Sequence, residues 1–308
     1  GYALSSGTAL DQVSLPHLSA SLELYQASAL VHDDIIDKAD ERRGMPTPHR
    51  TLAHHHASSS WIGSSTDFGR HAAILVGDFL FSAATAAADE QALALREDCA
   101  RAFTRRFADM HAEVALGQYL DITAEQTPLD PQRTDALSTS DSLEVALHKS
   151  AHYSVVHPAI LGAICGASTF DGVAELLDVL ETILTPWGLA FQLRDDDLGV
   201  FGDPAVTGKP AGDDLREGKR TALLALTWEA SSPAERRALT DVLGVPEASA
   251  DQIATATEIV ERNGRAAHEA EIARLVADGH AALDASGFNE NARAMLRDLC
   301  SILTARRA

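Results

Sequence analysis

Two clusters of aspartate residues carry the side chains best suited to chemistry in this sequence. The first, at 33–37, reads Asp-Asp-Ile-Ile-Asp, and the second, at 195–197, reads Asp-Asp-Asp. Each follows an apolar, helix-like stretch, so its carboxylates would face a core in which charge is costly unless a cation neutralises it. Asp33 and Asp37 fall on one helix face because a turn takes 3.6 residues. Two stacked carboxylates form half of a site for Mg2+, which prefers oxygen ligands and completes its shell with water and substrate phosphates.

Two such helices facing each other would hold several Mg2+ ions, with a gap between them suited to a diphosphate. The alternative is that both clusters are solvated acidic helix ends, as most aspartate-rich runs are. The positions of the basic residues separate these two interpretations.

The lysines are few and lie close to the aspartate clusters. The net charge of −20 argues against nucleic-acid binding, and it would repel an anionic substrate unless local cations reversed the sign. The chain has four lysines: Lys38, Lys149, Lys209 and Lys219. Lys38 directly follows the first cluster, and two others lie in the Gly-rich stretch 202–219 after the second. Because lysine is a common phosphate binder, this pattern favours a metal and diphosphate site over solvated helix ends.

The composition predicts helices and a cytoplasmic location. Of the 308 residues, 45% are hydrophobic and only 5% aromatic, with abundant Ala and Leu and few β-branched runs. No apolar stretch of about eighteen residues runs uninterrupted by charge, and residues 1–10 do not resemble a signal peptide. Three cysteines, far apart, do not suggest a disulfide framework or a zinc knuckle.

Apolar periodicity predicts one large all-α domain over residues 1–308, with no repeat and no long linker. The polar segments 63–67 and 127–140 are expected to be a loop and a connector. The expected helices are 18–36, 74–88, 93–122, 142–165 with a kink at Pro158, 173–198 with a break at Pro186, 221–230, 248–284 and 291–306.

Ordered motifs between about residues 20 and 225 resemble those of the trans-isoprenyl diphosphate synthases, or polyprenyl synthetases. The matching segments are 30–47 and 191–203, which carry the aspartates, then 117–121, 149–153, and the pair 207–210 and 214–221. The resemblance implies an all-helical bundle around a central cavity, the isoprenoid synthase fold, and usually a homodimer. It implies head-to-tail condensation of isopentenyl diphosphate with an allylic diphosphate.

The resemblance also implies metal ligands and a lid. Asp33 and Asp37 would bind two Mg2+ ions, with Asp34 in support, and Asp195 would bind a third ion with Asp196 nearby. The segment from Gly202 to Lys219 would close before the allylic diphosphate ionises, because water would quench the cation.

Further residues would contact the substrates. The resemblance implies that the allylic diphosphate is contacted by Arg42, Lys149, Lys209 and Lys219. It implies that isopentenyl diphosphate is held by Arg43 and Gln26, and that the allylic cation is faced by Ser150 and Gln192. Two of these assignments have open alternatives. Gln26, where many relatives have His, could be a polar helix position without function, and Ser150 a small packing residue.

Three features depart from the family pattern. Gly199 stands where many relatives have the last aspartate of the second motif. The upstream Gly-Gly-Lys-Arg-x-Arg segment is absent and is expected to precede Gly1. The run 54–56, His-His-His, is interpreted as a solvated turn and not as a metal site, because consecutive side chains point in different directions.

The motifs argue against two rival functions. A class I terpene cyclase would pair the first motif with an Asn/Ser/Glu metal motif that the Asp195 region lacks, and a non-catalytic subunit would have lost aspartates or lysines.

Ser28 and Ala29 are small where short-product relatives have aromatics, so Tyr25 is the candidate floor of the chain pocket. We expect geranylgeranyl diphosphate as product, with farnesyl or longer polyprenyl diphosphates as alternatives.

Overall fold

The computed structural model describes residues 1–9, 12–202, 212–245 and 247–305. Its helices are α1 (Tyr2–Ser6), α2 (Pro16–Ile36), α3 (Pro48–Ser58), α4 (Ser65–Leu93), α5 (Glu97–Gln126), α6 (Thr139–Ala146), α7 (His157–Gly166), α8 (Ala174–Phe201), α10 (Asp213–Glu217), α11 (Ala222–Ala230), α12 (Pro233–Thr240), α13 (Ala250–Asn263), α14 (Arg265–Ala285) and α15 (Glu290–Thr304). A 3₁₀ turn (Thr134–Ala136) and a π-helix (Leu147–Val156) complete the helical segments, and two short strands, β1 (Glu41–Arg42) and β2 (Met45–Pro46), form a hairpin.

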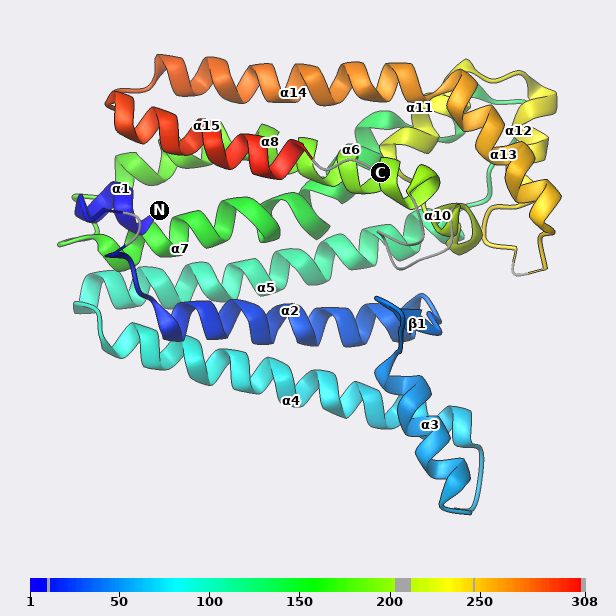
Figure 1. Ribbon diagram of the computed structural model, residues 1–308, viewed down its shortest axis with the longest axis horizontal. Coiled ribbons are helices and arrows are strands. Elements are labelled where there is room, and N and C mark those ends of the chain that lie inside the picture. The colour runs from blue at the N-terminus through cyan, green and yellow to red at the C-terminus, as the bar shows by residue number, and fades with distance from the viewer. Residues whose placement is uncertain (10–11, 203–211, 246, 306–308) are drawn as a thin grey trace.

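The long helices lie side by side along the long axis of the molecule (Figure 1). Helix α2 packs along α4, and α8 packs against both α14 and the π-helix. The end of α2 that carries the first aspartate cluster lies at the same end of the bundle as α10 (Figure 1). The predicted all-α fold is confirmed.

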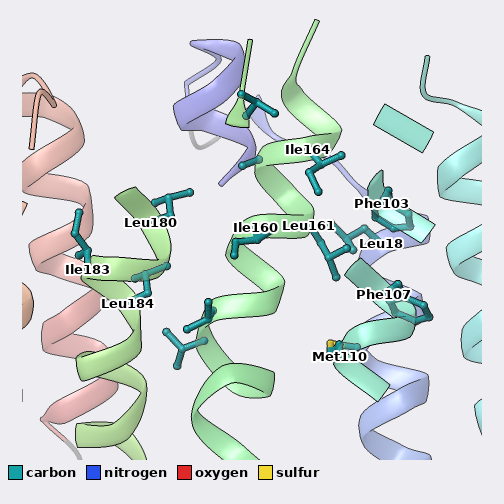
Figure 2. Packing of buried hydrophobic residues seen from close by; sticks show 14 of the residues in the cluster. Leu18, Phe103, Phe107, Met110, Ile160, Leu161, Ile164, Leu180, Ile183 and Leu184 are labelled. Carbon is teal, nitrogen blue, oxygen red and sulfur yellow. The ribbon is translucent and has the colours of Figure 1, made fainter. Parts of the chain in front are cut away.

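An apolar core joins the helices at the opposite end of the bundle. In Figure 2, Leu161 of α7 lies between Leu184 of α8 and Phe103 and Phe107 of α5, and all four are buried. Close packing of this kind means that truncating a buried Leu lowers the free energy of unfolding by about 2–5 kcal/mol. The core therefore holds α5, α7 and α8, and the site residues that they carry, in fixed relative positions.

Several expected helix boundaries are wrong. Pro186 does not break α8, which runs through it to Phe201. The expected helix 248–284 is two helices that meet at Gly264, which packs tightly against Thr227 of α11. The segment 63–67 is only partly a loop, because the side chain of Ser64 accepts a hydrogen bond from Asp67 and caps α4.

The histidine run does not form a solvated turn. Residues 54–56 lie within α3, and the side chain of His56 is buried between Trp61 and Phe68. The signal for this helix was Pro48, which starts it, because proline is favoured in the first helical turn.

The expected kink at Pro158 takes the form of a π-helix just before it. The segment Leu147–Val156 has the wider π winding, and the backbone N–H of His157 bonds the carbonyl of His152, five residues back. Proline has no N–H to continue the α-helical ladder. The residues expected at 149 and 150 to contact substrate therefore lie on an irregular turn, a form that is frequent at functional sites.

Helix α4 has an unusually apolar outer face. By length and composition it could cross a membrane, and it alone passes that test in the described part of the chain. Gly69, Ala73 and Gly77 bury the other face against α3 and α2. Leu75 and Phe79 are exposed, at 67% and 72% of their surface.

Candidate active site

A tight hairpin turns Arg42 back onto the first aspartate cluster. Arg43 and Gly44, between β1 and β2, both have left-handed backbones, with φ of 54° and 71°, as a two-residue type I′ turn requires. The guanidinium of Arg42 donates to Asp34 at 2.7 Å and to Asp33 at 3.2 Å. Asp34 is only 2% exposed. Arg42 therefore neutralises the buried carboxylate of Asp34.

A close approach between α5 and the π-helix places Lys149 beside the first cluster. A side chain on Gly117 of α5 would overlap the backbone of Lys149, so glycine permits this contact. The ammonium of Lys149 donates to Asp121 of α5 at 2.6 Å and to Asp33 at 3.5 Å. Burial alone would lower the pKa of Lys149, but Asp121 and Asp33 together raise it. The lysine is charged at neutral pH.

Lys219, just beyond α10, contacts the first aspartate cluster from a distant part of the sequence. Its ammonium lies 2.9 Å from Asp37, 3.0 Å from Glu125 and 3.6 Å from Asp121. Burial would lower the pKa of Lys219, but these carboxylates hold the pKa above its usual value. Lys219 is therefore a fixed positive charge, as its expected role requires.

The aspartates of the second cluster point in different directions. The carboxylate of Asp196 accepts a hydrogen bond from Gln192 at 2.9 Å, within α8. Asp197 instead forms an ion pair with Arg265 of α14, at 3.0 Å. Asp197 therefore fixes α8 to α14, whereas Asp196 faces the interior of the site.

Gly199 makes room for a carboxylate from another helix. A Cβ atom at position 199 would overlap the side chain of Asp214 on α10. Asp214 thus lies beside the second cluster at the place where many relatives have the last aspartate of the motif. Sequence reasoning missed Asp214, although its motif position beside Lys219 was a usable signal.

One pocket collects residues from both halves of the chain. The lining combines one aspartate each from α5, α8 and α10 with three basic residues and several small or polar side chains. The lining residues are Asp121, Ser142, Val145, Ala146, Lys149, Ser150, Gln192, Asp196, Asp214, Lys219, Arg220 and Thr221. Lys149 and Lys219 line this pocket and also contact Asp33 and Asp37. The two aspartate clusters are therefore brought to one site.

The other predicted site residues are placed as follows. Ser150 and Gln192 line the pocket, and Arg43 is exposed in the hairpin turn. Gln26 is partly exposed on α2, about 10 Å along the axis before Asp33. Lys209 lies outside the described residues.

The site carries more negative charge than its lysines balance. Burial, then Asp214, raises the pKa of Asp196 well above its usual value. Burial and Asp33 likewise raise the pKa of Asp37, against the lowering effect of Lys219. Asp121 and Glu125, which the sequence reading left without roles, add two further carboxylates. Such a site favours the binding of additional cations.

Comparison with known proteins gives this arrangement a family. The model of the family described as "Polyprenyl synthetase" matches residues 3–260. The chain belongs to the polyprenyl synthetase family. It is thus a trans-prenyltransferase by class, as the motifs predicted.

Relatives and solved structures within the family differ in product. The chain is 33% identical to a geranylfarnesyl diphosphate synthase of Aeropyrum pernix, over 80% of the chain and 68% of the relative. It is 31% identical to a (2E,6E)-farnesyl diphosphate synthase of Mycobacterium tuberculosis, over 94% and 73%. A crystal structure of geranylgeranyl pyrophosphate synthase from Corynebacterium glutamicum, complexed with isoprenyl diphosphate and magnesium, has a TM-score of 0.84 and 38% identity, over 94% of this chain and 79% of that one. The chain spans about two thirds of the length of the curated relatives.

The adjacent arginines are expected to serve different substrates in this synthase. Replacing either by Lys keeps the charge but removes the planar guanidinium that binds oxygens in pairs. Arg42→Lys should raise the KM for the allylic diphosphate, and Arg43→Lys the KM for isopentenyl diphosphate, each several-fold. Steady-state kinetics with one substrate varied at a time measures this. Identical effects of both changes on both substrates would contradict the division.

Proposed function

We propose that this chain condenses isopentenyl diphosphate with an allylic diphosphate in a Mg2+-dependent reaction and releases geranylgeranyl diphosphate. One observation carries the proposal: Lys149 and Lys219 line a pocket with Asp196 while contacting Asp33 and Asp37. Residues 1–308 act as a single synthase domain. Its location is cytoplasmic.

The acidic residues fit Mg2+. They offer only oxygen donors, and the raised pKa values of Asp37 and Asp196 reflect burial and then neighbouring carboxylate charge, which a divalent cation would neutralise. Asp33 and Asp37 would hold two ions and Asp195 a third, with Asp34 and Asp196 in support. Bound Mg2+ would neutralise the diphosphate and make it a better leaving group.

The chain's own cations act on the same leaving group. Lys149, Lys219 and Lys209 would bind the oxygens on which charge grows as the allylic carbon–oxygen bond ionises. Because the charges of Lys149 and Lys219 are held in place by carboxylates, they would stabilise the transition state more than the ground state. The oxygens of Ser150 and Gln192 would face the allylic cation. The double bond of isopentenyl diphosphate would then attack that cation and form the new carbon–carbon bond. No side chain is assigned as general base, so the departing diphosphate would take the proton from the resulting carbocation and give the product.

The product pocket is proposed to descend along α2 from Asp33 to Tyr25. Tyr25 is 5% exposed and stacks on His111 of α5 at 4.3 Å between ring centres, with Tyr153 and Phe81 at 5.4 and 6.0 Å. These rings form a floor about 12 Å from Asp33 along the helix axis. This floor lies further from Asp33 than positions 28 and 29, where short-product relatives have aromatics, and this supports a product longer than farnesyl diphosphate.

Ser28, one of the two small residues that the sequence places beside the chain pocket, lies on another face of α2. The hydroxyl of Ser28 donates to the carbonyl of Gly77 at 2.8 Å and is buried against α4. Ser28→Phe would therefore disturb the packing of α2 on α4. Ala29 shares the face of Asp33 by helical spacing and is the better position for a blocking side chain.

Product length is expected to follow the floor. Tyr25→Ala should shift products toward longer chains by opening the aromatic cluster, and Ala29→Phe should shift them toward farnesyl diphosphate. Chromatography of products made from labelled isopentenyl diphosphate measures both shifts, with Glu23→Ala on the exposed face of α2 as control. A wild-type enzyme that stops at fifteen carbons, or two unmoved distributions, would place the floor elsewhere.

We also propose a homodimer through the outer face of α4 and α5. Leu75 and Phe79 of α4 and Leu116 and Tyr119 of α5 are each more than half exposed. Large exposed apolar surfaces mark interfaces. Phe79→Glu should convert a dimer into a monomer, as light scattering after size exclusion would show. A wild-type monomer at micromolar concentration would refute this part.

Incubation with labelled isopentenyl diphosphate and each allylic diphosphate in turn tests the function directly. We expect condensation with every accepted primer and its loss when Mg2+ is withheld. Cyclic hydrocarbons as the main product would favour a terpene cyclase. No turnover with any primer would favour a non-catalytic subunit.

A further inference from the structure

Three histidines surround one carboxylate outside the diphosphate pocket. The ring nitrogens Nδ1 of His148 and His152, both on the π-helix, lie 2.7 and 2.6 Å from Oε1 of Glu113 on α5. The Nε2 atom of His157, at the start of α7, lies 2.7 Å from Oε2 of the same carboxylate. The four side chains are 3% to 27% exposed. None of the four lines the pocket described above.

Hydrogen bonding to one carboxylate does not by itself account for three imidazoles around it. Each ring nitrogen must carry a proton to donate to Glu113, so the cluster needs three matched tautomers or extra positive charge. The Nδ1 atom of His157 is buried without a hydrogen-bond partner among the described residues. Burial would raise the pKa of Glu113, but the three imidazole contacts hold it well below its usual range. Glu113 therefore stays ionised and available as a ligand.

The same atoms form a donor set for a transition metal. The ligand atoms of Glu113, His148 and His152 lie within 4.8 Å of one another. Ligands at 2.0–2.1 Å around a tetrahedral ion are about 3.4 Å apart, so small side-chain rotations would close the site. Imidazole with a carboxylate suits zinc, whereas Mg2+ prefers oxygen ligands alone. The third imidazole, His157, can serve as a fourth ligand.

We propose that Glu113, His148 and His152, with His157, bind a zinc ion distinct from the magnesium ions of the diphosphate site. Lys149 and Ser150 lie between two of the ligands, on the π-helical turn that would be fixed by the metal. The ion would therefore act as a positioning element for Lys149, away from the reacting atoms.

Metal titration of the chelator-stripped full chain tests this. When ZnCl2 is added in the presence of a large excess of Mg2+, wild-type protein should bind about one equivalent of zinc with a submicromolar Kd. Competition with a chromogenic chelator measures this affinity. His148→Ala and His152→Ala should each weaken zinc binding by about 100-fold or more, because each removes a ligand. Asp33→Ala should leave zinc binding unchanged, since it alters only the magnesium side. His54→Ala, on the exposed face of α3, is the matched histidine control.

Two further readouts do not depend on the chelator competition. Co2+ in the same site should give the strong visible absorption of a tetrahedral ion, lost when ZnCl2 is added. Zinc should also raise the Tm of wild type but not of Glu113→Gln, which keeps the side chain's shape. No zinc binding by wild type in excess Mg2+, or equal binding by wild type and His152→Ala, would overturn the proposal. Either result would concern the zinc site alone, because prenyl transfer is assayed separately, with Mg2+.

Discussion

Replacing Asp33 or Asp195 by Ala is expected to lower turnover by about 10²- to 10⁴-fold, the effect of removing roughly 3–5 kcal/mol of transition-state stabilisation. Carboxylates cannot face a diphosphate without cations between them, because like charges about 4 Å apart repel by roughly 4 kcal/mol at an effective dielectric of 20. Removing one metal ligand should therefore weaken Mg2+ activation as well as turnover. Initial rates across a Mg2+ titration measure both effects.

Asp197→Asn is the matched control, since that residue contacts Arg265 and lies on the α14 side of α8. Its turnover should stay within a few-fold of wild type, and circular dichroism should show unchanged helix content in all three variants. Near-normal turnover in EDTA would reject metal-dependent prenyl transfer altogether.

Replacing Lys149 by Met is expected to reduce kcat by about 10²- to 10³-fold, with a smaller change in KM. Lys149 is partly buried and contacts both Asp121 and Asp33, so its charge is held beside the leaving group without further reorganisation. One preorganised charge of this kind contributes about 3–4 kcal/mol to a transition state. Single-turnover measurements would separate the chemical step from product release.

Lys38→Met is the control for this prediction, because Lys38 also follows the first cluster but is exposed. Lys149→Arg should restore only part of the rate, since a guanidinium is wider than the ammonium that Asp121 holds at 2.6 Å. Equal losses for Lys38 and Lys149 would show that general charge, and not position, governs the reaction.

Much of the fold was predictable because its determinants are local. Helical periodicity and the scarcity of aromatic and β-branched residues predicted an all-α chain, and α2 begins at Pro16, only two residues before the expected start. Errors came where packing overrides propensity. Pro186 stays inside α8, whose buried Trp187 and Leu184 hold the helix on both sides of it. Tertiary contacts there outweigh the lost backbone hydrogen bond.

The sequence by itself determined the chemistry of the site: aspartates at helical spacing, three of the four lysines close to them, and the order of the motifs. Only the tertiary structure decided which of these groups meet. Lys219 reaches Asp37 across 182 positions of sequence, and Asp214 fills the space at Gly199. Periodicity reports the face of one helix and not its neighbour, so it could not show that Ser28 faces α4 or that Asp197 faces α14. Those contacts follow from how the helices pack, which depends on the whole chain at once.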